Sequence, residues 1–395
     1  MHRRRLLVLG LLGLLASLAA PLQQAAGQAT PVAPPGITAR ITALLVTAIH
    51  DPLRVTGSDG MVHLEYDLIL TNVFTAPVTI STLEVLTPEG QSLLRLEGET
   101  LEAMTQPLFG RTPTDVVPES GALAAMLDVV VPPDQVPERL THRITYTLPP
   151  DAPEPALLGT HEIRGPDLAV DPFESVVIAS PLRGSGWLNA NGCCDASAHR
   201  SFRLAVDGSH LVTPETFAID WVRLDANNRF FTGDGTRNED YPGFGAEIHA
   251  VADGTVVFVR DGIPEETPNE PPTTLHQPLD YGGNEVVLEL TPGVFAFYAH
   301  MQPGSIRVQI GETVTTGQVL GRLGNTGNST APHLHFELAD GPDVLTANSL
   351  PFVIDEYTLV GSVAPESTAD DIRIVGTPEQ QIETLPLDPT VADFG

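Results

Sequence analysis

The sequence of 395 residues contains no lysine: its 20 basic residues are all arginine, against 50 acidic residues. Without a lysine amine, the chain cannot form a lysine Schiff base with a substrate and cannot carry the lysine of a phosphate-binding loop. The formal net charge is −30. Nucleic acids and anionic membrane surfaces would repel such a chain, so we expect neither as a partner.

Cysteine and aromatic residues are also scarce. The only two cysteines, Cys193 and Cys194, are adjacent, so the chain is not a disulfide scaffold. Neighbouring Cα atoms lie about 3.8 Å apart, closer than the roughly 4.4–6.8 Å usual in disulfides. The pair is therefore either a strained local staple or two free thiols. Aromatic residues make up 6% of the chain, which argues against a carbohydrate-binding β-protein with exposed aromatic platforms.

Long apolar runs are confined to the N-terminus. Three arginines, Arg3–Arg5, precede the apolar run Leu6–Ala20, and Ala25–Gly27 offers small residues for cleavage. The run is shorter than the roughly 20 residues of a membrane-spanning helix. We predict that residues 1–27 are a secretory signal and that the chain is exported (extracellular or cell envelope), with no membrane segment after signal removal. An uncleaved anchor is the alternative.

Most of the remaining sequence has the period of β-strands. One run alternates apolar residues with mostly polar ones at Val62, Leu64, Tyr66, Leu68 and Leu70. Such runs, separated by turns such as "SDG" and "PEG", predict an all-β fold with an N-terminal antiparallel sandwich of immunoglobulin-like type. The predicted parts are a signal (1–27), a Pro-rich linker (28–37), the sandwich (38–150), a linker (151–174), a compact antiparallel β catalytic domain (175–355) and an acidic tail (356–395) that is mostly disordered or loosely draped.

The stretch "STAPHLHFEL" places two histidines, His333 and His335, two residues apart in a predicted strand. Alternate strand residues share a face and lie about 6.5–7 Å apart. One imidazole of such a pair can bind a metal while the other stays beside it and takes a proton from a water molecule. Glu337 shares the same face, where it either orients a ligand or is an exposed carboxylate.

The context of this pair resembles the lysostaphin-type zinc endopeptidases, which cleave peptide bonds of bacterial peptidoglycan. The resemblance covers about residues 199–338. Its motifs are "FAID", "GAEIHAVADGTVV", "YGGNEVVLEL" and the long segment "FAFYAHMQPGSIRVQIGETVTTGQVLGRLGNTGNSTAPHLHFEL". The resemblance implies a compact antiparallel β domain of the lysostaphin type that binds Zn²⁺ and acts on a peptide substrate.

The resemblance also implies roles for four residues. His335 and Asp220 correspond to zinc ligands. His333 corresponds to the general base, and His300, in "YAH", to the residue that polarises the carbonyl and holds the oxyanion. Zinc with three protein ligands keeps an open position and lowers the pKa of bound water to about 7.

One position departs from the pattern of the family, which has a histidine four residues before the aspartate. Here that position is Thr216, a poor zinc ligand. We predict that His199 is the third ligand. If residues 199–206 form a strand, 207–210 a turn and 216–222 the returning strand, His199 lies directly across from Asp220. A bulge at Pro214 would turn His199 to the other face.

Two functions from different classes follow. The chain is predicted to be an exported zinc metalloendopeptidase that hydrolyses peptide bonds, in peptidoglycan or another peptide substrate. The alternative is a catalytically degenerate domain that binds cell wall or regulates another hydrolase. Thr216, at the position where the family has a histidine, would suggest this alternative. The Pro- and acid-rich stretch 261–280 interrupts the catalytic region, and we predict that it borders the cleft.

Overall fold

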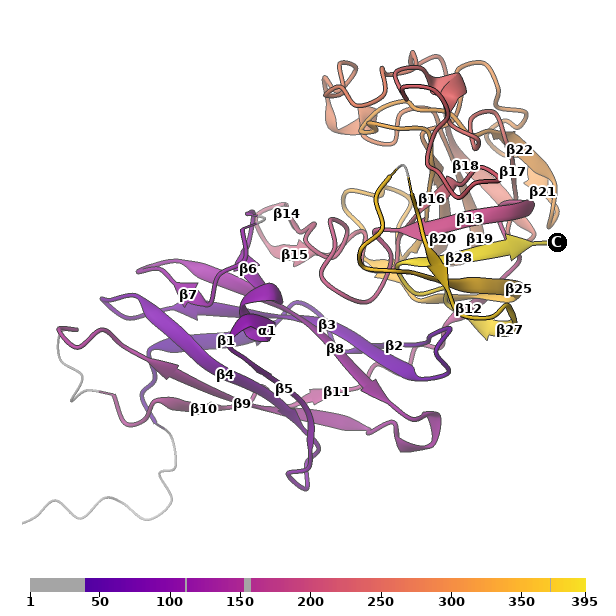
Figure 1. The fold of residues 1–395 in the computed structure, drawn as a ribbon. Coiled ribbons are helices and arrows are strands. Elements are labelled where there is room, and N and C mark those ends of the chain that lie inside the picture. Colours follow the sequence, from indigo (N-terminus) through magenta and orange to yellow (C-terminus); the bar gives the residue numbers. More distant parts are fainter. Residues whose placement is uncertain (1–39, 111, 153–157, 370) are drawn as a thin grey trace, which may run out of the picture. The chain divides into compact units, whose positions relative to one another are not determined.

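The computed structural model describes residues 40–395 except residues 111, 153–157 and 370. Its regular structure is almost entirely strand, so the predicted all-β class is confirmed (Figure 1). The helical elements are short: α1 (Glu99–Ala103) and the single 3₁₀ turns Pro133–Gln135, Asn238–Asp240 and Pro278–Asp280. Within the described residues, no helix has the length and apolar character needed to cross a membrane. The predicted signal and the 28–37 linker lie outside these residues.

Residues 44–169 form two antiparallel sheets around one apolar core. The first sheet contains β1 (Leu44–Ala48), β2 (Leu53–Thr56), β3 (Val62–Asn72), β6 (Thr105–Pro107) and β8 (Ala122–Val131). The second contains β4 (Val78–Leu86), β5 (Ser92–Glu97), β7 (Val116–Val117), β9 (Arg139–Thr147), β10 (Glu162–Arg164) and β11 (Leu168–Ala169). The apolar face predicted for β3 does line this core. The immunoglobulin-like description of the sandwich stays a prediction.

The stretch 151–174 is not simply a linker. Its strands β10 and β11 both pair with β9 and so extend the second sheet of the sandwich. The strands have only 3 and 2 residues. Because so short a run carries too few alternations to be told from irregular chain, the sequence pattern did not reveal them.

The second half of the chain is built on a 13-stranded sheet, which is antiparallel except where β12 pairs with β25. Along its main path the order is β12-β25-β28-β13-β16-β23-β20-β19-β18-β21. The strands are β12 (Val176–Ile178), β13 (Gly184–Ala190), β16 (Ile219–Arg223), β18 (Gly254–Arg260), β19 (Glu285–Thr291), β20 (Val294–Ala299), β21 (Thr313–Val314), β23 (Leu334–Ala339), β24 (Ser349–Leu350), β25 (Phe352–Val363), β26 (Ile374–Val375), β27 (Glu379–Thr384) and β28 (Thr390–Phe394). Two small two-stranded sheets pair β14 (Leu204–Val206) with β15 (His210–Val212) and β17 (Glu247–His249) with β22 (Val319–Arg322).

The prediction of a disordered tail over residues 356–395 is wrong. Strand β25 runs on to Val363, and β28 inserts between β25 and β13 in the sheet. Val391 and Phe394 are buried in apolar clusters. The acidic and Pro-rich composition suggested disorder, but composition does not register the few apolar residues that alternate within these strands and reach the core.

Cys193 and Cys194 lie between β13 and β14 and are joined to each other as a disulfide. Of the two alternatives left open by the sequence, the structure therefore has the local staple. Both cysteines are buried.

Candidate metal centre

Three neighbouring strands bring the core of the site together. Strand β16 carries Asp220 directly opposite His335 on β23. On the other side of β23, His335 pairs with Ala299 at the end of β20, and His300 follows directly. In-register antiparallel pairing thus gathers an aspartate and two histidines that are far apart in the sequence.

His300 leaves β20 with an unusual backbone conformation. Its φ of 62° lies in the left-handed region, which residues other than glycine seldom occupy. Two hydrogen bonds hold the backbone there: its N–H donates to the Gly282 carbonyl, and its carbonyl accepts from the N–H of Gly324. Residues kept in such conformations cluster at functional sites.

His199 reaches the site by a route that differs from the predicted one. The predicted hairpin register is wrong: Val206 pairs with His210, so the turn is centred on Gly208, and β14 begins only at Leu204. Positive φ values at Asp207 and Gly208 set this tight turn. Asp220 pairs with Ala190 and His335 instead. His199 lies on the irregular segment 191–203, which we call the His199 loop.

Three histidine rings converge on the carboxylate of Asp220. His335 Nδ1 lies 2.9 Å from Asp220 Oδ1. His199 Nε2 lies 3.3 Å from Oδ2, and His333 Nε2 lies 3.3 Å from Oδ1. One nitrogen or oxygen from each of His199, Asp220 and His335 lies within 4.8 Å of the others.

The hydrogen bonds on the far side of two rings indicate that a cation suits this cluster. His199 Nδ1 lies 3.1 Å from the Ala218 carbonyl, and His333 Nδ1 lies 2.8 Å from the Ala331 carbonyl. A carbonyl only accepts, so each Nδ1 must donate, and in a neutral ring Nε2 then carries a lone pair. Both lone pairs face the carboxylate of Asp220. The lone pairs and the carboxylate repel one another, so either a second proton on a ring or a metal cation is needed between them.

The site also changes the ionisation of its members. Burial would raise the pKa of Asp220, but His199 and His333 outweigh it and hold that pKa well below its usual range. Burial would lower the pKa of His335, but the neighbouring carboxylates of Asp220 and Glu337 raise it well above its usual range. Two nitrogens and an ionised carboxylate form a donor set that zinc accepts.

Glu337 is buried below the ring of His335 and is not the exposed carboxylate considered as one alternative. It is 0% exposed, and its Oε1 lies 3.6 Å from His335 Nε2. Burial raises the pKa of Glu337 to about 7. His335 therefore has a carboxylate on each side, with Asp220 at Nδ1 and Glu337 at Nε2. A carboxylate behind a ligand histidine fixes its ring and raises its basicity.

His300 and His333 face each other, with ring centroids 4.7 Å apart. His300 Nδ1 lies 2.7 Å from the Thr326 carbonyl, so Nδ1 donates and Nε2 carries the lone pair of a neutral ring. Burial lowers the pKa of His300, and the neighbouring His333 and His335 lower it further, so that it lies well below its usual range. His300 is thus a neutral ring with an accepting Nε2.

All five residues predicted for the site line one cleft of about 280 Å³. The same cleft is lined by six polar residues that were not predicted as site residues: Asn191, Glu215, Tyr281, Asn328, Ser329 and Thr330. Asn191 donates to Asp220 Oδ2 at 2.8 Å, and the Tyr281 hydroxyl donates to Glu215 Oε1 at 2.8 Å. The "YGGN" motif contains Tyr281 and offered a signal for it, whereas Asn191 and Glu215 carried none.

Thr216 does not line the cleft. It is 1% exposed, and its hydroxyl donates to the Thr213 carbonyl. The other histidines of the catalytic part, His210, His249 and His276, are also absent from the cleft lining. The stretch 261–280 does not line the cleft itself, but it contacts a lining residue: Asn269 N–H donates to the carbonyl of Thr330 at 2.8 Å.

The fold and the site thus define an all-β domain with a candidate metal centre of two histidines and an aspartate. Residues 240–345 match the profile of Peptidase family M23. The predicted resemblance to lysostaphin-type peptidases is confirmed over these residues. His300, His333 and His335 lie within the matched residues, whereas His199 and Asp220 lie before them.

Curated relatives are similar over a short stretch only. The glycyl-glycine endopeptidase ALE-1 of Staphylococcus capitis is 46% identical over 57 residues, covering 14% of this chain and 15% of that protein. The peptidoglycan DD-endopeptidase ShyA of Vibrio cholerae is 38% identical over 86 residues, covering 22% of this chain and 17% of that protein. The chain therefore spans less than a fifth of the length of these relatives.

Two solved structures align with comparable parts of the chain. The catalytic domain of the M23 protein EnpA from Enterococcus faecalis is 21% identical, with 44% of this chain and 93% of that chain covered and a TM-score of 0.26. The catalytic domain of lysostaphin from Staphylococcus simulans is 21% identical, with 42% and 88% covered and a TM-score of 0.23.

Proposed function

We propose that the chain is an exported zinc metalloendopeptidase that hydrolyses peptide bonds of peptidoglycan. The observation that carries the proposal is the convergence of His199, Asp220 and His335 in one cleft with His300 and His333. The family match and the endopeptidases among the relatives support the reaction class. The predicted signal in residues 1–27 supports export.

His199, Asp220 and His335 are the proposed zinc ligands. Their two imidazole nitrogens and one carboxylate leave room for a further ligand, as in catalytic zinc sites. When bound, zinc supplies Lewis acidity that lowers the pKa of a water molecule and polarises a carbonyl group. Glu337 and the Ala218 carbonyl orient the two histidine rings, because they contact the ring nitrogens of His335 and His199 that face away from Asp220.

His333 is the proposed general base. Its Nδ1 donates to the Ala331 carbonyl, so its Nε2 is available to accept the proton of the attacking water. His300 is proposed to polarise the scissile carbonyl and hold the oxyanion. Because the neutral ring presents a lone pair at Nε2, His300 has to take up a proton at that atom before it can donate to an oxyanion.

The alternative is a degenerate domain that binds cell wall or regulates another hydrolase. It rested on Thr216, which stands at the position where the family has a histidine. In the proposed ligand set His199 compensates for that loss. The two functions differ in metal content and in turnover. An inactive domain lacks a stoichiometric metal and releases no peptide fragments.

The test combines metal analysis with digestion of purified peptidoglycan. We expect about one zinc per chain and release of new amino termini, both abolished by a strong chelator and restored by added zinc. The matched control is the His335→Ala variant, for which neither signal is expected. A folded wild-type chain without zinc, or one that holds zinc but cleaves neither peptidoglycan nor its peptides, contradicts the proposal.

A further inference from the structure

Strand β3 of the sandwich is buried on both faces. Its apolar residues line the sandwich core, as the alternation predicts. Its other face carries Glu65 and Asp67, and both are 0% exposed. An alternating strand normally turns its charged face to water, and carboxylates are seldom fully buried without a partner. A second part of the chain must therefore cover these two acids.

The covering residues come from the His199 loop. Arg200 lies 2.7 Å from Glu65 and 3.3 Å from Asp67, and Arg203 lies 2.6 Å from Asp67. The side chains of all four residues are 0% exposed. Buried pairs of this kind are screened little by solvent and salt, and they hold their partners in a narrow geometry.

Further contacts join the His199 loop to the other strands of the same sheet. Arg200 also donates to the Leu127 carbonyl of β8 at 3.4 Å, and the Ser201 hydroxyl donates to Gln106 of β6 at 3.3 Å. Elsewhere, Leu53 and Val55 of β2 belong to the apolar core of the second half of the chain, residues 175–395, which we call the peptidase half. The sandwich and the peptidase half therefore share packed and charged contacts.

The His199 loop has little regular structure of its own. It joins the end of β13 to the start of β14, and its internal backbone hydrogen bonds are turns such as Phe202 N–H to the His199 carbonyl. His199 itself is 6% exposed and directly precedes Arg200. The first part of the loop is held by Asp388, whose N–H donates to the Cys193 carbonyl. Next to His199 itself, the contacts are the Ala218 carbonyl at its ring and the ion pairs of the arginines that follow it.

We propose that strand β3 positions the metal-ligating His199 through Arg200 and Arg203, so that the sandwich is a structural part of the metal centre. This inference rests on the proposed function, because it takes His199 as a ligand. Arg200 and Arg203 are positioning residues: they act through the loop and touch neither substrate nor metal. The third ligand thus comes from a segment whose conformation depends on another sheet.

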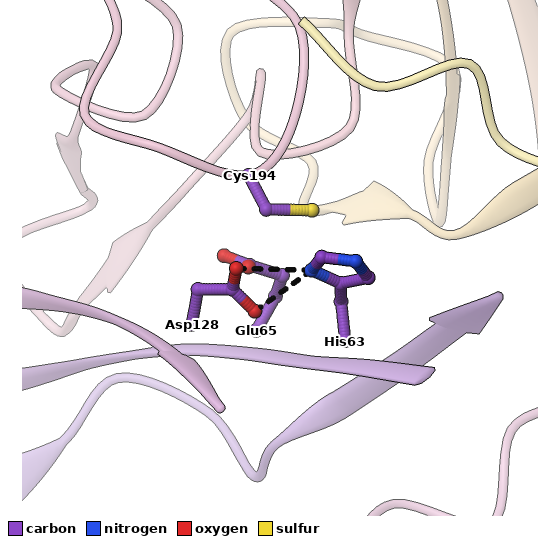
Figure 2. Close-up of side chains that lie close together, drawn as sticks. All are labelled: His63, Glu65, Asp128 and Cys194. Carbon is purple, nitrogen blue, oxygen red and sulfur yellow. Dashed lines mark hydrogen bonds and ion pairs between the residues drawn. The ribbon is translucent and has the colours of Figure 1, made fainter. Parts of the chain in front are cut away.

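The same region contains a second group of potential metal ligands. His63, Glu65, Asp128 and Cys194 lie close together, with His63 Nδ1 2.9 Å from Asp128 Oδ2 (Figure 2). Cys194 is joined to Cys193 and offers no thiolate. The Arg200 guanidinium already occupies the position beside Glu65 that a cation would take. The cluster is therefore part of the anchor for the His199 loop.

The test uses charge-balanced variants of the full chain, Glu65→Gln with Arg200→Gln and Asp67→Asn with Arg203→Gln. Each removes an ion pair without leaving its partner charged and alone. The matched control is Glu84→Gln with Arg143→Gln, an ion pair of 2.7 Å that joins β4 to β9 inside the sandwich. Zinc affinity is measured by competition with a chelating dye, and folding by circular dichroism and thermal unfolding.

We expect zinc to bind about 10–100-fold more weakly to each anchor variant, as when partners behind metal ligands are removed, and unchanged affinity in the control. His199→Ala sets the scale for complete loss of this ligand. If wild type binds no zinc, the proposed function fails. A different outcome overturns the anchoring inference alone: wild type binds zinc, His199→Ala binds it more weakly, and the folded anchor variants keep wild-type zinc affinity. Should an anchor variant not fold, the same affinity criterion applies to Arg200→Lys and Arg203→Lys, which keep the charge but lose the planar fork.

Discussion

Asp220 and His335 lie directly opposite each other on β16 and β23, with His335 Nδ1 2.9 Å from Asp220 Oδ1. This pairing places one ligand oxygen and one ligand nitrogen at the centre of the cleft. His333 directly precedes β23, and its Nε2 approaches the same Asp220 oxygen. The carboxylate of Asp220 therefore contacts both the proposed ligand His335 and the proposed base His333.

The two histidines of the pair should separate metal binding from catalysis. We expect His335→Ala to lose both zinc and hydrolysis, because it removes a ligand. His333→Ala should keep zinc and lose about 10²–10⁴-fold in turnover, the usual contribution of a general base. Zinc content and peptide-release rates of both variants decide this. Equal zinc loss in the two variants contradicts the division of labour.

Glu337 should act on zinc affinity through His335. Replacing it with Gln keeps the shape but removes the charge behind His335 Nε2, 3.6 Å away. We expect about 10-fold weaker zinc binding with little change in the fold. The matched control is Glu289→Gln on β19 of the same sheet, a residue that does not line the cleft. Unaltered zinc affinity in Glu337→Gln removes this carboxylate from the metal centre.

Glu285 should make the folded state less stable as the pH rises. Burial raises its pKa to about 7, against an opposing effect of Arg260. Since the folded chain then binds this proton more tightly than the unfolded chain, the contribution of Glu285 is most favourable below about pH 4.5 and is lost as the pH rises to about 7.

The corresponding measurement compares wild type with Glu285→Gln in urea at pH 5 and pH 8. The variant should gain up to roughly 3 kcal/mol relative to wild type between these pH values, from a pKa shift converted at about 1.36 kcal/mol per unit. A difference between the two proteins that does not change with pH contradicts the raised pKa.

The stretch 261–280 should limit access to the cleft. Glu266 organises it by accepting hydrogen bonds from Thr273 and Thr274, and Asn269 ties it to Thr330 at the cleft. Replacing residues 264–277 with a short Gly-Ser linker should widen the range of peptides cleaved. Assays with linear and cross-linked peptides check this. A stable variant with unchanged cleavage of every substrate contradicts a lid.

Local pattern was enough to predict much of the protein. Alternating apolar residues indicated the β fold and the core-facing side of β3. The spacing of His333 and His335, together with the resemblance of the motifs around His300 and Asp220 to the lysostaphin-type family, predicted residues that do line one cleft. These features depend on two-residue periodicity and short motifs, which the sequence carries within a few residues.

Pairings between distant segments were decided only by the tertiary structure. His199 lies beside Asp220, as predicted, but on a loop rather than across a hairpin, because the turn at Gly208 shifts the register of β14 and β15. The sequence pattern of β3 predicts that its charged face is exposed to solvent. In the structure, arginines that lie about 135 residues further along the chain bury that face. Strand β28 completes the sheet although its composition suggests disorder. Burial of charge and insertion of a late strand depend on which surfaces meet, and no local period encodes that.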